Sequence, residues 1–189
     1  MSVKEQKQLK MISDNVERLM NLIKQIRQYM RSDEPMNMSP QSLIAITEII
    51  TNKYRLKNNN PELRIISKYE DNLPNVNLNR SAITSVMDNL LSNAIKYTPK
   101  GTITVSVHRE VDQLITSVQD TGYGIKEEAI PHLFNPYYQA ESHDKEIVGG
   151  IGIGLYTAKR YINQHGGTIS VTSVEGHGST FTFSLPIWH

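Results

Sequence analysis

Apolar residues recur along the first thirty positions in alternating steps of three and four. The members of this seam are Leu9, Ile12, Val16, Leu19, Ile23, Ile26 and Met30. Such a narrow stripe is typical of a helix that pairs with another helix, because a helix packed on its own globular domain needs a wider apolar face. We therefore favour a helix–helix dimer seam over an amphipathic helix lying on its own domain. Pro35 and the following segment to Pro40 are predicted to end the helix.

Helix and strand patterns are interleaved along the rest of the chain without regular alternation. A helix capped by Ser39 or Ser42 is predicted before the polar run 57–61, and two more are predicted over 81–97 and 155–165. Strand patterns cover residues 63–69, 102–109, 114–119, 168–174 and 179–185, and an irregular stretch lies between about 122 and 152. This arrangement predicts an α/β (α+β) two-layer sandwich, in which helices cover one face of a mixed β-sheet.

Composition narrows the function classes. The 189 residues carry a net charge of only +1, so no broad basic field attracts nucleic acid or an anionic membrane. The absence of cysteine excludes disulfides, thiolate metal sites and cysteine nucleophiles. With neither a signal peptide nor an apolar run of about 20 residues, we expect a cytoplasmic domain without a membrane span of its own.

The predicted helix 81–97 carries two stripes. Its apolar stripe consists of Ile83, Val86, Leu90 and Ala94. Asn89, Asn93 and Lys96 form a second, polar stripe, although asparagine is a poor helix former. Amide oxygens are hard ligands suited to Mg²⁺, and a lysine one turn further on can meet phosphate charge. On this feature alone, a solvated helix face is the favoured interpretation.

Three glycine-containing segments follow. Asp120 ends a strand just before Gly122 and Gly124, and an ionised carboxylate there suits the amine of adenine but repels the carbonyl of guanine; a plain aspartate–glycine turn is an equal alternative. The run GGIGIGL at 149–155 leads into a helix, whose free N–H groups and dipole favour phosphate, yet it matches neither the dinucleotide fingerprint nor the P-loop. The segment GHGS at 176–179, taken alone, indicates a hairpin turn.

Taken in order, these segments resemble the sequence boxes of sensor histidine kinases. The matches are NLLSNAIKY at 89–97, DTGYGI at 120–125, Phe134 in LFNPYYQ, GIGIGL at 150–155 and GHGS at 176–179. The resemblance covers residues 5–187 and implies the Bergerat fold. Residues 1–34 would be the second helix of the family's dimerisation and phosphotransfer hairpin, and residues 35–189 the catalytic ATP-binding domain.

The resemblance also implies a role for each matching residue. Asn89 and Asn93 would hold Mg²⁺ and the triphosphate, and Asn89 and Lys96 would act in catalysis. Asp120 would read the adenine amine. The other residues expected to bind or surround ATP are Tyr97, Gly122, Gly124, Ile125, Phe134, Gly150, Gly152, Gly154, Leu155 and Ser179. The stretch from about 126 to 150 would be a mobile lid, anchored by its phenylalanine.

The chain departs from the family pattern in three respects. Gln139 stands where some members have an arginine, and Ile151 replaces a common threonine. None of the six histidines lies on the seam helix, and all six are interpreted as surface residues. The acceptor histidine is therefore expected upstream, in a longer receptor whose anchoring in the inner membrane stays an open alternative.

The implied activity is that of a protein histidine kinase in a two-component system, which is a transferase and a phosphoprotein. Its expected partners are ATP, the upstream phosphotransfer helix, a dimer partner and a response-regulator receiver domain, with no nucleic acid. ATP-hydrolysing machines such as gyrase, mismatch-repair and heat-shock ATPases share the pocket, but they carry a glutamate where Asn89 stands, and Asp88 points about 100° away. A non-catalytic nucleotide-dependent dimerisation module is the third alternative, disfavoured by the intact asparagines and glycines.

Overall fold

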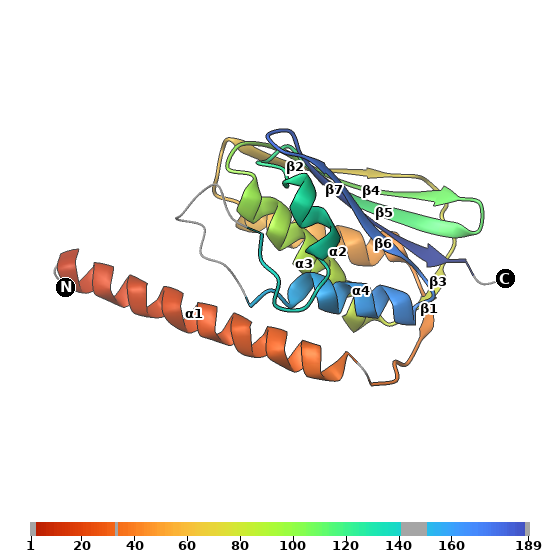
Figure 1. Ribbon diagram of the computed structural model, residues 1–189, viewed down its shortest axis with the longest axis horizontal. Helices are drawn as coiled ribbons and strands as arrows, with labels where there is room; N and C mark the ends of the chain where they lie inside the picture. The colour runs from red at the N-terminus through yellow and green to blue at the C-terminus, as the bar shows by residue number, and fades with distance from the viewer. Residues whose placement is uncertain (1–2, 33, 141–150, 188–189) are drawn as a thin grey trace.

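The computed structural model describes residues 3–32, 34–140 and 151–187, which form a long N-terminal helix and a layered α/β domain (Figure 1). The elements in chain order are α1 (Val3–Arg31), β1 (Ser39–Gln41), α2 (Leu43–Lys57), β2 (Leu63–Tyr69), β3 (Val76–Leu78), α3 (Arg80–Tyr97), β4 (Gly101–Glu110), β5 (Gln113–Asp120), the 3₁₀ helix η1 (Glu127–His132), α4 (Gly154–Gln164), β6 (Ile169–Val174) and β7 (Gly178–Pro186). Within these ranges, no helix has the length and apolar character needed to cross a membrane.

Five strands form one mixed sheet in the order β2-β4-β5-β7-β6. β2 runs parallel to β4, and all other neighbours are antiparallel. α2, α3 and α4 cover one face of the sheet, and α1 runs along the outside of this helical layer (Figure 1). The predicted two-layer sandwich is confirmed. β1 and β3 pair as a separate short ribbon that the sequence did not predict, because three residues are too few to show an alternation.

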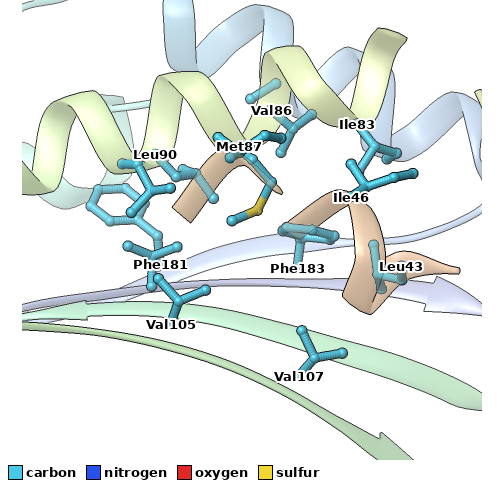
Figure 2. Packing of buried hydrophobic residues seen from close by; sticks show 14 of the residues in the cluster. Leu43, Ile46, Ile83, Val86, Met87, Leu90, Val105, Val107, Phe181 and Phe183 are labelled. Carbon is cyan, nitrogen blue, oxygen red and sulfur yellow. The ribbon is translucent and has the colours of Figure 1, made fainter. Parts of the chain in front are cut away.

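The core lies between the sheet and the helices. Alternate residues of the strands point toward the helices, so that Val105, Val107 and Phe183 face Met87 and Leu90 of α3 (Figure 2). The predicted apolar stripe is buried throughout, with Ile83, Val86 and Leu90 at 0% exposure and Ala94 at 4%. This packing fixes the rotation of α3 about its own axis and so decides where the polar stripe of the same helix lies.

Side-chain caps define where two of the helices begin. The hydroxyl of Ser42 accepts a hydrogen bond from the Ala45 N–H at 3.2 Å, as predicted for one of two serines. The side chain of Asn79 caps α3 in the same way through the Ala82 N–H at 3.0 Å. α1 ends at Arg31, before the predicted stop at Pro35. Its seven seam residues are 45–73% exposed, as an unpartnered seam should be.

His165 corrects the expectation that every histidine lies on the surface, since it is 4% exposed at the end of α4. Its Nε2 accepts a hydrogen bond from the Asn79 N–H at 2.9 Å, and its Nδ1 lies 2.5 Å from the Tyr161 carbonyl oxygen. Burial lowers the pKa of this imidazole, so it is neutral with the proton on Nδ1. The residue was misassigned because its partner, the cap of α3, is 86 positions away in the chain.

Candidate functional site

A cavity of about 490 Å³ opens beside α3, at the end of β5 and the beginning of α4. It is lined by predicted site residues from four separate segments: Asn89, Asn93, Lys96, Tyr97, Asp120, Gly124, Ile125, Gly152, Gly154, Leu155 and Ser179. The structure therefore brings together the polar stripe of α3 and the glycine segments that are far apart in the sequence. A cavity of this size fits a small-molecule ligand.

The α3 wall of the cavity is polar because the opposite stripe of the helix is committed to the core. Asn89 and Asn93 lie one turn apart on this wall, and the Lys96 ammonium lies 4.9 Å from the centre of the Tyr97 ring. Asp88 belongs to a different face, since its carboxylate forms an ion pair with Lys53 at 2.7 Å. The only charge that α3 places on this wall is thus positive, which suits an anionic ligand.

Asp120 supplies a buried acceptor at the other end of the site. Its carboxylate is 6% exposed and accepts the Gly122 N–H at 2.9 Å, and the Ser179 N–H also donates to it. Burial raises the pKa of Asp120, and these two backbone hydrogen bonds offset part of that shift. The carboxylate also lines the cavity, so it can accept a hydrogen bond from a ligand.

Two glycines allow the backbone around Asp120 to pack closely. A Cβ on Gly122 would lie 2.1 Å from the Tyr97 carbonyl oxygen, so only glycine fits against the end of α3. Gly124 has a φ of +66°, and a Cβ there would lie 2.1 Å from the Val174 carbonyl oxygen. Gly122 itself is buried behind the cavity wall rather than lining it. The two residues shape the site through the backbone.

The second glycine segment lies where α4 meets α3. A Cβ on Gly154, the first residue of α4, would lie 2.9 Å from the Asn89 Oδ1 atom. The N-terminal N–H groups of α4 therefore begin next to the asparagine wall, where the helix dipole favours an anion. Gly150 and residues 141–149 of the predicted lid lie outside the described residues.

Phe134 is half-buried against the core and does not line the cavity. The ammonium of Lys159 lies 5.6 Å from the centre of its ring, so Phe134 packs beside α4. The stretch predicted to be irregular, from about 122 to 152, contains η1 (Glu127–His132), of which Glu128 and Ala129 line the cavity.

Several lining residues were not predicted from the sequence, namely Gln25, Tyr123, Lys126, Glu128, Ala129, Leu133 and Tyr138. Most of them flank the predicted glycine boxes and could have been found by extending those boxes. Gln25 gave no such signal, because it belongs to α1.

The donor set fits Mg²⁺ only as part of a metal–phosphate complex. Within the described residues no group of three or more histidine, cysteine, aspartate or glutamate side chains is placed to hold a metal ion. The asparagine wall offers two amide oxygens instead, which are suitable hard ligands but too few to hold the ion alone. Phosphate oxygens of a nucleotide would complete the coordination.

The layered fold with this cavity is the fold of histidine kinase catalytic domains. The crystal structure of full-length ShkA in complex with AMPPNP superimposes with a TM-score of 0.82 at 18% identity, over 98% of this chain and 39% of that chain. The Acinetobacter baumannii histidine kinase AdeS gives a TM-score of 0.76 at 22% identity, over 96% of this chain and 84% of that chain.

Sequence comparison identifies the family. The model described as "Histidine kinase-, DNA gyrase B-, and HSP90-like ATPase" matches residues 79–189, more than half of the chain. The chain belongs to this family, as its resemblance to sensor histidine kinases predicted.

Two curated relatives named as sensor kinases show the extent of the match. Sensor histidine kinase WalK of Bacillus subtilis is 31% identical over 172 residues, which cover 89% of this chain and 28% of the relative. Adaptive-response sensory kinase SasA of Microcystis aeruginosa is 41% identical over 124 residues, which cover 65% of this chain and 32% of the relative. The chain thus spans about a third or less of the length of these relatives.

Proposed function

We propose that the chain is the ATP-binding catalytic core of a two-component sensor histidine kinase and directs the γ-phosphate of ATP to a histidine on a separate, upstream helix. One observation carries the proposal: a single cavity joins a buried carboxylate acceptor, Asp120, to an asparagine- and lysine-lined wall beside the N-terminus of α4. Adenine needs the first feature and a metal-bound triphosphate needs the second.

At the adenine end, Asp120 accepts the exocyclic amine, and Ser179 positions the carboxylate through its N–H. Ile125 and Leu155 supply apolar contact, because both line the cavity and both pack against the core. Gly122 and Gly124 keep the backbone close enough for this geometry. Guanine would present a carbonyl oxygen to the same carboxylate and be repelled.

At the phosphate end, the amide oxygens of Asn89 and Asn93 hold Mg²⁺ together with the phosphates, and Lys96 neutralises phosphate charge beside Tyr97. Gly152 and Gly154 leave room for the phosphates at the start of α4. When bound, the metal supplies charge neutralisation of the transferring phosphoryl group. Gly150 would extend this loop, and Phe134 would anchor the segment beside α4.

Transfer to a histidine is favoured over hydrolysis by the residues of α3. Asn89 cannot accept a proton from water, and the neighbouring Asp88 is paired with Lys53 on another face. Among the residues that the structure describes, the carboxylates that line the cavity are Asp120 and Glu128, and neither comes from the asparagine wall. This supports a kinase rather than an ATP-hydrolysing machine of the gyrase type.

The proposed division of the chain places the dimerisation and phosphotransfer helix at 1–34 and the catalytic domain at 35–189. The exposed seam of α1 supports this division, because a helix of the four-helix hairpin bundle needs an apolar stripe for its partners. A homodimer, the acceptor helix and a response-regulator receiver domain are the proposed partners.

Incubation with γ-labelled ATP tests the proposal. The chain alone should remain unlabelled, and a second polypeptide that carries the acceptor helix should gain an acid-labile, alkali-stable label. Asn93→Ala should abolish this transfer, whereas Asn59→Ala, an exposed asparagine outside the cavity, should leave it intact. Label on the chain alone, or fast release of free phosphate without transfer, would contradict the proposal.

A further inference from the structure

α1 reaches the cavity. Gln25 of α1 lines it together with residues of the α/β domain and is half-buried there. The nearby seam residues Ile23 and Ile26 are 60% and 45% exposed. The last two turns of α1 therefore present one face to the cavity and another to the outside. A polar side chain on a cavity wall, held by a separate helix, needs a reason beyond helix packing.

Side chains of α4 hold the end of α1 in this position. The Tyr161 hydroxyl donates to the Gln28 carbonyl oxygen at 3.2 Å, and the Gln164 amide donates to the Ser32 carbonyl oxygen at 2.9 Å. Carbonyl groups at a helix C-terminus lack partners within the helix, so α4 caps α1. Gln25, Gln28 and Ser32 recur at helical spacing and lie on one face of the helix.

Tyr29 adds an aromatic contact on the same side. Its ring centre lies 5.6 Å from that of Tyr156 in α4 and 6.2 Å from that of Tyr137, in tilted arrangements. A side-chain hydrogen bond with Tyr137 also joins the two side chains and raises the pKa of Tyr29. The three rings connect α1 with α4 and with Tyr137, whose neighbour in sequence, Tyr138, lines the cavity.

Tyr137 continues this contact to the glycine segment. Its N–H donates to the Gly152 carbonyl oxygen at 2.8 Å, and its φ is +65°, a conformation that a tyrosine seldom adopts. A Cβ on Gly152 would lie 2.7 Å from the Tyr137 carbonyl carbon. Gly152 leads to the start of α4 beside Asn89, and Tyr29 lies one helical turn from Gln25. These contacts bring the end of α1 next to the glycine segment of the proposed phosphate site.

We infer that Gln25 is a further nucleotide-contacting residue, whose side-chain amide donates to phosphate oxygens, and that Tyr29 is the positioning residue that keeps it there. This inference rests on the proposed function. It follows that ATP binding and the docking of α1 stabilise each other, because each contact that the nucleotide makes with Gln25 exists only while α1 is docked.

Calorimetric titration of the full chain with Mg²⁺–ATP and with adenosine tests the contact. Gln25→Ala should weaken ATP binding about two- to tenfold, as expected for one lost hydrogen bond. Gln25→Glu keeps the shape but adds charge that repels phosphate, so its loss should be larger. Adenosine has no phosphate, and its affinity should change less than about twofold in either variant. Gln8→Glu adds the same charge at an exposed position of α1 about 25 Å away along the helix and should change neither affinity.

The positioning role has its own readout. Tyr29→Ala should weaken ATP binding as much as Gln25→Ala, and the double variant should be no weaker than either one, since both remove the same contact. Tyr29→Phe keeps the ring contacts and should stay within about twofold of the wild type. Hydrogen exchange at residues 25–32 should slow when ATP binds to the wild type and stay fast in Tyr29→Ala.

The outcomes separate the two proposals. Wild-type binding of ATP with no loss in Gln25→Glu, or an equal loss for ATP and adenosine, overturns the inference and leaves the proposed function standing. Additive losses in the double variant overturn the positioning role of Tyr29. A wild-type chain that binds neither ligand overturns the proposed function, and the inference with it.

Discussion

Asp120→Asn converts one oxygen acceptor of a buried carboxylate into an amide donor without changing the size of the side chain. In the wild type, the carboxylate faces the N–H groups of Gly122 and Ser179 and is proposed to accept the adenine amine as well. The asparagine has a single acceptor oxygen, which we expect to stay with the Gly122 N–H, the donor at 2.9 Å from the wild-type carboxylate. Its NH₂ group replaces the second carboxylate oxygen, so the side chain loses an acceptor for the Ser179 N–H, the Thr98 side chain and the adenine amine.

The expected loss is that of one hydrogen bond to a charged group. Such a bond contributes about 1.5–3 kcal/mol, so ATP affinity should fall about 10- to 150-fold. GTP should respond differently, because the new amide can donate to the guanine carbonyl that the carboxylate repels. The preference for ATP over GTP should therefore shrink from both sides.

Folding should survive the change. Burial raises the pKa of Asp120, so the ionised carboxylate costs the folded protein stability at neutral pH relative to the unfolded chain. Asparagine removes this buried charge, and that gain offsets the mismatch of donors. The melting temperature of Asp120→Asn should thus stay near or above the wild-type value, so that weaker binding cannot be attributed to unfolding.

Calorimetric titration with both nucleotides, alongside a thermal melt, decides the case. Asp71→Asn is the matched control, because Asp71 is an exposed aspartate in the turn between β2 and β3. Unchanged ATP affinity in Asp120→Asn would refute the reading of adenine by this carboxylate. An equal loss for ATP and GTP would show instead that the residue acts only by holding the backbone.

Three further predictions concern stability and assembly. Gly124→Ala should lower the free energy of unfolding by about 3 kcal/mol or more in urea titrations, because it combines a positive φ with a backbone clash. The control Gly176→Ala has a φ of +80° but no atom within 4 Å of the added Cβ, so it should lower the free energy of unfolding by only about 1–2 kcal/mol. Equal losses would show that the clash at Gly124 relaxes. The free energy of unfolding should fall as the pH drops below about 6.5, because His165 binds a proton in the unfolded chain but stays neutral in the folded protein, where burial lowers its pKa. His165→Gln should flatten this pH dependence of stability, and His177→Gln, at an exposed position, should not. The chain should self-associate weakly, and Ile23→Ser should raise the dimer dissociation constant about tenfold or more in sedimentation equilibrium, since it removes an apolar side chain from the seam; an unchanged constant would mean that the dimer uses another surface.

Much of the cavity lining could be predicted from the sequence, because the patterns that indicate it lie within short segments of the chain. The helix that carries Asn89 and Asn93 has its buried stripe and its polar stripe within 17 residues, so periodicity alone gave both faces. The glycines of the cavity stand where a Cβ would clash with neighbouring atoms, and a glycine indicates such a close approach even when the neighbouring segment is unknown. Asp120 was identified as an acceptor from its place at a strand end, but its burial and its two N–H partners depend on β7 and had to come from the structure.

The contribution of α1 could not be predicted, because a heptad pattern states which positions are apolar and says nothing about what surrounds the others. Gln8 and Gln25 are both polar residues beside the seam, yet only Gln25 reaches the cavity. The difference comes from hydrogen bonds between α1 and α4, which join residues 133 and 132 positions apart. Since the docked face and the seam are different sides of one helix, pairing of the seam with a partner helix leaves the contact with the cavity in place. Under the proposed function, the same helix can therefore pair with a partner helix and contact the nucleotide at once.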